Sequence, residues 1–268
     1  MSRDMKWREP EAGFEYEPDE VLVTPEYQHE KLRACGISPE IFGGCVDPSF
    51  YIGLGIHAGI RSGISAEGNV NMLQSLVQYR PVALGESLRV CGVITAVTPV
   101  PRGWTIDTDV WFEDAQGGRV IGARRRSLKP DPSKTGTSGA GDRPQPVIEA
   151  ETKLQTLARH RLTPEQVVAY SSEGNSIHYD MAAANRAGFR APLIGGGMGV
   201  HYLMAALWSQ DVPGLLDLDI FFRRPIFWDE TFEVAISAEQ DAICLRQADS
   251  GKVLTEARIN ARSSAEAA

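Results

Sequence analysis

The sequence is poor in cysteine and has no segment suited to export or anchoring. Its 268 residues include four cysteines, none of which forms a Cys-x-x-Cys pair or lies in a histidine-rich cluster. Neither a disulfide scaffold nor a zinc site is therefore expected. Residues 1–20 are rich in charge and lack the apolar core of a signal peptide. We expect a cytoplasmic protein with reduced thiols.

Long hydrophobic runs are also missing. The segment Ala191–Gln210 contains no charged residue, but it opens with a proline and three consecutive glycines. Only about a dozen of its residues remain for a helix, which is too few to span a bilayer. We expect a buried core helix here and no membrane partner.

Basic residues are in the minority. Lys and Arg total 27 against 35 Asp and Glu, which gives a formal net charge of −8 and argues against nucleic acid as a partner. The hydrophobic fraction of 43% is that of a folded protein rather than a disordered one. The length suits one large domain or two smaller ones.

The clearest break in the sequence is residues 131–146, which are dense in Gly, Ser, Thr, Pro and charge and are typical of a linker. They separate a first domain, residues 1–130, from a second, residues 147–268. Three segments recur in the same order in both halves: Thr24-Pro25-Glu26 with Thr163-Pro164-Glu165, Ala58–Arg61 with Ala187–Arg190, and Arg80-Pro81-Val82 with Arg224-Pro225-Ile226. These matches predict an internal duplication.

Each half is expected to form one main helix followed by an antiparallel meander, an α+β layer in which the sheet can wrap the helix. The Thr-Pro-Glu triplets are typical of helix starts. The apolar stretches Val70–Val77 and Met198–Trp208 occupy equivalent central places before the strands. Alternating segments and glycine turns predict the strands Ser87–Ile94, Trp104–Phe112, Arg119–Leu128, Thr231–Ile236, Ala242–Gln247 and Lys252–Ala261.

The densest polar cluster lies at residues 171–180. Glu173 and His178 are five residues apart, with the amide of Asn175 between them. This trio can hold one water molecule, because Glu173 can accept its proton while His178 donates or accepts the other. Glycines 195–197 then lead into the apolar helix, where free backbone N–H groups and the helix dipole suit an oxyanion such as a polarised thioester carbonyl.

The spacing of this motif resembles that of a known family. Glu173-x-Asn175-x-x-His178, followed by Gly197-Met198, is similar to the motif of the MaoC-like dehydratases and (R)-specific enoyl-CoA hydratases. The stretch Leu76–Pro81 resembles the non-catalytic N-terminal part of the same family. The resemblance implies a double hot-dog fold, in which two antiparallel sheets each wrap a central helix and form a pseudo-dimer with one working site.

The resemblance also implies a function, the interconversion of an enoyl-CoA and a 3-hydroxyacyl-CoA thioester. Glu173 and His178 would be the acid–base pair, Asn175 would orient the water or the pair, and Gly197, with Gly196, would form the oxyanion hole. The substrate would be an acyl-CoA or acyl-carrier thioester. No metal or redox cofactor is implied, since CoA belongs to the substrate, and a homo-oligomer is expected.

The motif departs from the family pattern at four positions. Glu173 stands where the family has Asp, Ser172 replaces Gly, Ser176 replaces Pro, and Gly196 replaces His. None of these changes removes a proton-transfer group. Two other functions remain open, a hot-dog acyl-CoA thioesterase and a non-catalytic acyl-CoA-binding subunit.

Arginines supply the candidate contacts with CoA. Arg223 and Arg224 precede a proline on a strand, and Arg125 lies in the basic run Arg124–Arg126. Guanidinium groups suit phosphates, although solvated strand edges explain the same residues. His201, on the apolar helix, is interpreted as a core histidine with satisfied hydrogen bonds.

Overall fold

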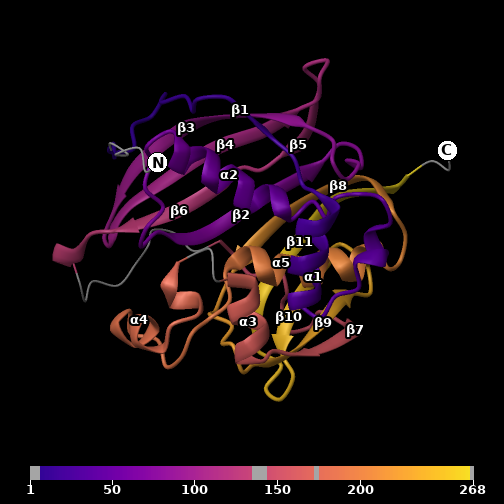
Figure 1. Cartoon of the computed structure of the whole chain (residues 1–268). Coiled ribbons are helices and arrows are strands. Elements are labelled where there is room, and N and C mark those ends of the chain that lie inside the picture. The colour runs from indigo at the N-terminus through magenta and orange to yellow at the C-terminus, as the bar shows by residue number, and fades with distance from the viewer. Residues whose placement is uncertain (1–6, 135–143, 172–174, 266–268) are drawn as a thin grey trace.

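The first half of the chain folds as a curved antiparallel sheet around one helix (Figure 1). The structure is a computed structural model, which describes residues 7–134, 144–171 and 175–265. The first elements along the chain are β1 (Asp19–Val21), α1 (Pro25–Ala34), the 3-10 turn η1 (Pro39–Phe42) and the central helix α2 (Phe50–Arg61). The elements that follow are β2 (Val70–Gln78), β3 (Leu88–Val100), β4 (Gly103–Glu113), β5 (Arg119–Gly122), β6 (Arg125–Pro130) and the 3-10 turn η2 (Pro132–Lys134).

The second half repeats this plan around a second central helix. It begins with β7 (Leu154–Arg161), α3 (Pro164–Ser171), the 3-10 turn η3 (Ser176–His178), α4 (Met181–Arg186) and the central helix α5 (Gly196–Trp208). Its other strands are β8 (Pro213–Phe222), β9 (Thr231–Ser237), β10 (Ala242–Gln247) and β11 (Val253–Ser264). Most of the expected linker, residues 135–143, lies outside the described residues, so the domain boundaries stay a prediction.

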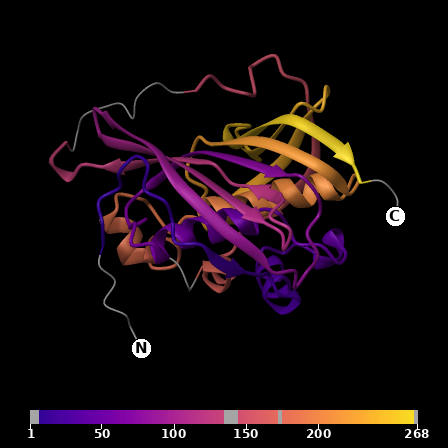
Figure 2. The ribbon, with the colours of Figure 1, turned by 90° about the horizontal axis from the view of Figure 1, so that it is seen from above.

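The two halves join edge to edge in one sheet. Its strand order is β1-β3-β4-β5-β2-β8-β11-β10-β9-β7, and β6 pairs with β2 and β4. Strands β2 and β8 pair antiparallel at the junction, where Leu76 lies opposite Leu218. Figure 2 shows the strands of the two halves side by side. The α+β class expected from the sequence is confirmed.

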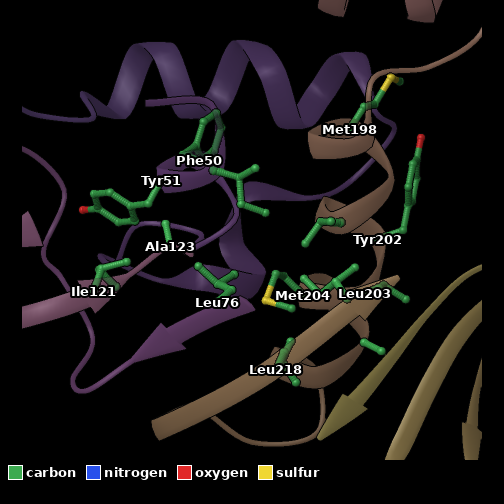
Figure 3. Close-up of a cluster of buried hydrophobic side chains, with 14 of the residues drawn as sticks. Phe50, Tyr51, Leu76, Ile121, Ala123, Met198, Tyr202, Leu203, Met204 and Leu218 are labelled. Atoms are coloured by element: carbon green, nitrogen blue, oxygen red, sulfur yellow. The ribbon is translucent and has the colours of Figure 1, made fainter. Parts of the chain in front are cut away.

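One apolar core connects the halves. Helix α5 contacts α2 and packs on β8, β9 and β10. Figure 3 shows Tyr51 and Leu76 of the first half in the same cluster as Leu203 and Met204 of α5. Helix α5 is apolar and buried on nearly all sides, as expected of a core helix. Among the described residues, no helix is long and apolar enough to cross a membrane.

Two expectations about the duplication are wrong. Val70–Val77 lies in strand β2, and the central helix of the first half is α2, earlier in the chain. Three glycines in α2 weaken its helical signal. The match of Ala58–Arg61 to Ala187–Arg190 is also misleading, because the first segment ends α2 whereas the second turns between α4 and α5, with Gly188 at a φ of +85°.

The other two matches fall on equivalent elements. The hydroxyl of Thr24 accepts a hydrogen bond from the N–H of Tyr27 at the start of α1. Thr163 does the same for the N–H of Gln166 at the start of α3. The two Arg-Pro segments follow β2 and β8, the strands that pair at the junction. The chain therefore repeats one architecture.

Candidate active site

His178 is fixed next to the segment that leads into α5. Its Nδ1 lies 2.7 Å from the backbone oxygen of Leu193. A carbonyl oxygen only accepts, so Nδ1 carries the proton and Nε2 of the neutral ring has a free lone pair. Burial lowers the pKa of His178, an effect that the bond to Leu193 opposes but does not cancel. The ring is therefore suited to accept a proton at Nε2.

Side-chain caps shape the turn that carries this histidine. The amide oxygen of Asn175 accepts a hydrogen bond from the N–H of Ile177, 3.2 Å away, and begins η3. The carboxylate of Asp180 accepts one from the N–H of Ala183 at 2.6 Å and begins α4. Asn175 thus holds the backbone of the turn, and its role in orienting water stays a prediction. Glu173, the predicted partner of His178, lies outside the described residues.

Helix α5 begins on glycine without a side-chain cap. Gly195 is its N-cap residue, and within the described part of the chain no side chain caps the first turn, which leaves backbone N–H groups for another acceptor. A Cβ atom on Gly195 would lie 3.6 Å from Nε2 of His178, and one on Gly196 would lie 2.8 Å from the ring of Phe222. Among the described residues, the nearest atom to a Cβ on Gly197 lies 3.9 Å away. The structure thus places His178 beside Gly195, while the oxyanion role of Gly196 and Gly197 stays a prediction.

Two of the arginines proposed to contact CoA are bound within the chain. Arg223 donates from Nε to Glu256 at 2.6 Å, and its two terminal nitrogens donate to the backbone oxygens of Pro144 and Gln145. Arg224 donates to the backbone oxygen of Val253 at 2.7 Å. The bonds from Arg223 to Pro144 and Gln145 hold the segment before β7 against the sheet. A contact of either arginine with CoA stays a prediction.

Arg125 lies in a different environment, inside the first half. It lines a cavity of about 10 Å³ together with Ile52 of α2 and Gln74 of β2, which is room for roughly one water molecule. One terminal nitrogen donates to the hydroxyl of Ser127 at 3.3 Å, whereas Nε is buried without a partner among the described residues. A contact of Arg125 with CoA also stays a prediction.

A buried polar network beside α5 is the feature that sequence reasoning missed. Nδ1 of His201 lies 2.7 Å from the carboxylate of Asp47 and 2.6 Å from the hydroxyl of Ser49. Its Nε2 lies 2.8 Å from the hydroxyl of Tyr170. The interpretation of His201 as a satisfied core histidine is confirmed. A lone histidine in an apolar helix was the available signal, but its carboxylate partner is 154 residues away in the sequence.

Two half-sheets that join edge to edge, each around a central helix, define a double hot-dog fold. Similar solved structures include HtdX from Mycobacterium tuberculosis, with a TM-score of 0.71 and 19% identity over 90% of this chain and 97% of that chain. A MaoC-like dehydratase from Phytophthora capsici has a TM-score of 0.71 and 17% identity over 94% of this chain and 96% of that chain.

A conserved hypothetical protein from Mycobacterium tuberculosis, described as a double hot dog, has a TM-score of 0.59 and 13% identity over 93% of this chain and 95% of that chain. No protein-family model matches the sequence, and no curated protein matches it. The expected double hot-dog fold is confirmed, and the chain shares it with MaoC-like dehydratases.

Proposed function

We propose that this protein is a MaoC-like hydro-lyase that adds water to an enoyl-CoA thioester or removes it from a 3-hydroxyacyl-CoA. The observation that carries the proposal is the position of His178, whose unprotonated Nε2 faces the uncapped glycine start of α5. A proton acceptor beside free backbone N–H groups suits a reaction that moves a proton while negative charge develops on an oxygen. The shared fold with MaoC-like dehydratases supports the same conclusion.

In the hydration direction, the thioester oxygen accepts a hydrogen bond from the N–H of Gly197. Glu173 and His178 hold the water molecule, and one of them takes its proton as the water oxygen bonds to C3. The electron pair of the C2–C3 double bond moves towards the thioester oxygen, and the enolate then takes up a proton at C2. One water is added and no electron is lost or gained, so the proposed reaction needs no redox cofactor.

Negative charge on the enolate oxygen makes the start of α5 important for the rate. In other enzymes, loss of one oxyanion donor costs about 10²–10³ in kcat. The positive end of the helix dipole adds to the direct hydrogen bonds. This chemistry explains why residues without side chains lie next to His178.

The direct test follows the loss of enoyl-thioester absorbance with short, branched and dicarboxylic enoyl-CoAs. We expect turnover by the wild type and a decrease of about 10²–10⁴-fold for Glu173→Gln and for His178→Gln, the range of acid–base catalysis. His160→Gln is the matched control, because burial also lowers the pKa of that histidine and its ring packs on Tyr202, away from the motif. Wild-type rates in both motif variants would contradict the proposal.

The same samples separate the two alternatives. Release of free CoA thiol from saturated acyl-CoAs would indicate a thioesterase. Saturable binding of acyl-CoA without turnover, unchanged by Glu173→Gln, would indicate a binding subunit. We further propose a cytoplasmic homo-oligomer, and the free thiol state of all four cysteines is compatible with a reducing compartment.

A further inference from the structure

Four side chains from both halves of the chain meet beside α5. We refer to Asp47, Ser49, Tyr170 and His201 as the cross-half network. His201 is 1% exposed and Asp47 is fully buried. The loop that carries Asp47 is itself held by Gln28, whose amide oxygen accepts a hydrogen bond from the N–H of Asp47 at 2.8 Å. Asp47 and His201 are therefore shielded from water. The donor and the acceptor of each of their hydrogen bonds can be inferred from the atoms that meet.

Ser49, His201 and Asp47 are the residue types of a hydrolytic triad, but their arrangement excludes that role. In a triad, the serine and the aspartate bind opposite nitrogens of the imidazole. Here the Ser49 hydroxyl and the Asp47 carboxylate both lie at Nδ1 of His201, and the Ser49 hydroxyl donates to Asp47 at 2.7 Å. Ser49 therefore supports the carboxylate, and Nε2 is left for Tyr170.

The number of protons on His201 determines whether the Tyr170 hydroxyl donates a hydrogen bond to its Nε2 or accepts one from it. A carboxylate oxygen accepts hydrogen bonds, so His201 donates to Asp47 from Nδ1. With a neutral ring, Nε2 accepts the hydroxyl proton of Tyr170. With a second proton on His201, Nε2 donates to the Tyr170 oxygen, and the tyrosine O–H is released for another acceptor.

The Tyr170 hydroxyl reaches the start of α5. Of the atoms that the structure describes, it is the nearest to a Cβ built on Gly197, at 3.9 Å, while Nε2 of His178 approaches Gly195. Lys31 fixes the backbone of Tyr170 by donating to its carbonyl oxygen at 3.1 Å. The phenol and the catalytic imidazole thus approach the same helix turn from different elements, α3 and η3.

We propose that the Tyr170 hydroxyl donates a hydrogen bond to the oxygen of an acyl thioester bound at the start of α5, and that His201 and Asp47 are positioning residues. This inference rests on the proposed function, which supplies the ligand class. A thioester oxygen only accepts, so the contact requires the state in which His201 carries two protons. The first half of the chain would then act on the reaction through Asp47.

Other titratable groups also face the network. Tyr27 and Lys31 come from α1, Cys35 follows that helix, and Tyr202 lies on α5. Burial raises the pKa of Tyr170, so its hydroxyl keeps the proton that it donates.

The kinetic test compares two tyrosines whose hydroxyls form hydrogen bonds within the fold. Tyr170→Phe removes the proposed donor, and we expect kcat to fall by at least about 10-fold, towards the 10²–10³ typical of an oxyanion donor. Tyr202→Phe is the matched control, since its buried hydroxyl donates to the backbone oxygen of Cys35 at 2.9 Å instead. Asp47→Asn should lower kcat more than it raises KM, and should add little to Tyr170→Phe. An unchanged kcat in Tyr170→Phe would overturn the inference.

A spectroscopic test reads the network without turnover. In protein labelled with ¹⁵N-histidine, His201 is assigned by comparison with His201→Gln, and butyryl-CoA, which has no double bond to hydrate, is the probe. We expect its binding to move the Nε2 signal of His201 from the unprotonated towards the protonated range, and expect no such change in Tyr170→Phe. A wild type that hydrates enoyl-CoA while this signal stays constant would overturn the inference alone. A wild type that neither turns over enoyl-CoA nor binds butyryl-CoA would overturn the proposed function as well.

Discussion

At the scale of single residues, His178 owes its proposed role to a backbone contact. Its Nδ1–H is bound to Leu193, two residues before the glycines that begin α5. One hydrogen bond therefore fixes the tautomer and sets the distance between the imidazole and the helix start. A backbone carbonyl or a carboxylate commonly sets the tautomer of a histidine in this way. In this chain the partner is the carbonyl of Leu193.

This environment predicts the pH dependence of the reaction. Burial lowers the pKa of His178 from its usual value of 6.5, so the neutral ring persists as the pH falls past 6.5 and is lost only when the pH reaches the lowered pKa. We expect the acid limb of kcat/KM that belongs to His178 to lie below pH 6.5, which a pH–rate profile would measure. An NMR titration of the His178 ring should give the same midpoint. A midpoint above 6.5 would contradict the assignment.

At the scale of elements, the first turn of α5 combines two glycines with different constraints. A methyl group on Gly196 would lie 2.8 Å from the ring of Phe222, whereas one on Gly197 would lie 3.9 Å from the nearest atom that the structure describes. Glycine at the first position is therefore required by packing. At the second it leaves open the space in which the thioester is proposed to bind.

Alanine substitutions should separate these two roles. Gly196→Ala should destabilise the fold by about 1–3 kcal/mol through overpacking. Gly197→Ala should leave stability unchanged or raise it by up to about 1 kcal/mol, since alanine favours helix, yet lower enoyl-CoA hydration. Urea denaturation and the absorbance assay measure the two effects. Full activity in Gly197→Ala would remove Gly197 from the proposed oxyanion hole.

The elements also show how far the sequence determines the fold. Thr24 and Thr163 predicted helix starts correctly, because capping is local. Strand alternation located most of the meander, although Arg119–Leu128 is divided into β5 and β6. Helix α2 was not predicted because its glycines weaken the helical signal. At Gly55 the glycine lets β4 approach, since a Cβ atom there would lie only 3.3 Å from Val110. That reason lies in a contact between distant segments.

The candidate site divides along the same line. Its motif was visible because residues 173–178 are neighbours in sequence. The bond between His178 and Leu193, and that between His201 and Asp47, depend on tertiary structure. No periodicity or spacing connects these partners, so the tautomer of His178 and the cross-half network could not be predicted.

At the scale of the whole molecule, the halves are parts of one structure. Strands β2 and β8 share a ladder, and buried Gln78 of β2 donates to the backbone oxygen of Pro213 at 2.7 Å. Helices α2 and α5 contact each other beneath this junction. Asp47 of the first half binds His201 of the second. A disturbance at the junction should therefore reach both halves.

Leu76 provides the test of this coupling, since it is 1% exposed and lies opposite Leu218 at the junction. Leu76→Ala should lower the free energy of unfolding by about 2–5 kcal/mol. Val70→Ala is the control on the same strand, and because Val70 is 51% exposed its effect should stay within about 0.5 kcal/mol.

The readout is restricted to the second half by replacing the first-half tryptophans, Trp7, Trp104 and Trp111, with Phe, which leaves Trp208 and Trp228. In this background, Leu76→Ala should move the fluorescence transition in urea to lower concentration, in coincidence with far-UV circular dichroism. The substituted residue belongs to the first half and the signal to the second, so coincident transitions are the result expected if the halves unfold together. A second-half transition that stays in place while the dichroism shifts would show that the halves unfold separately, and the pseudo-dimer would then be two independent domains.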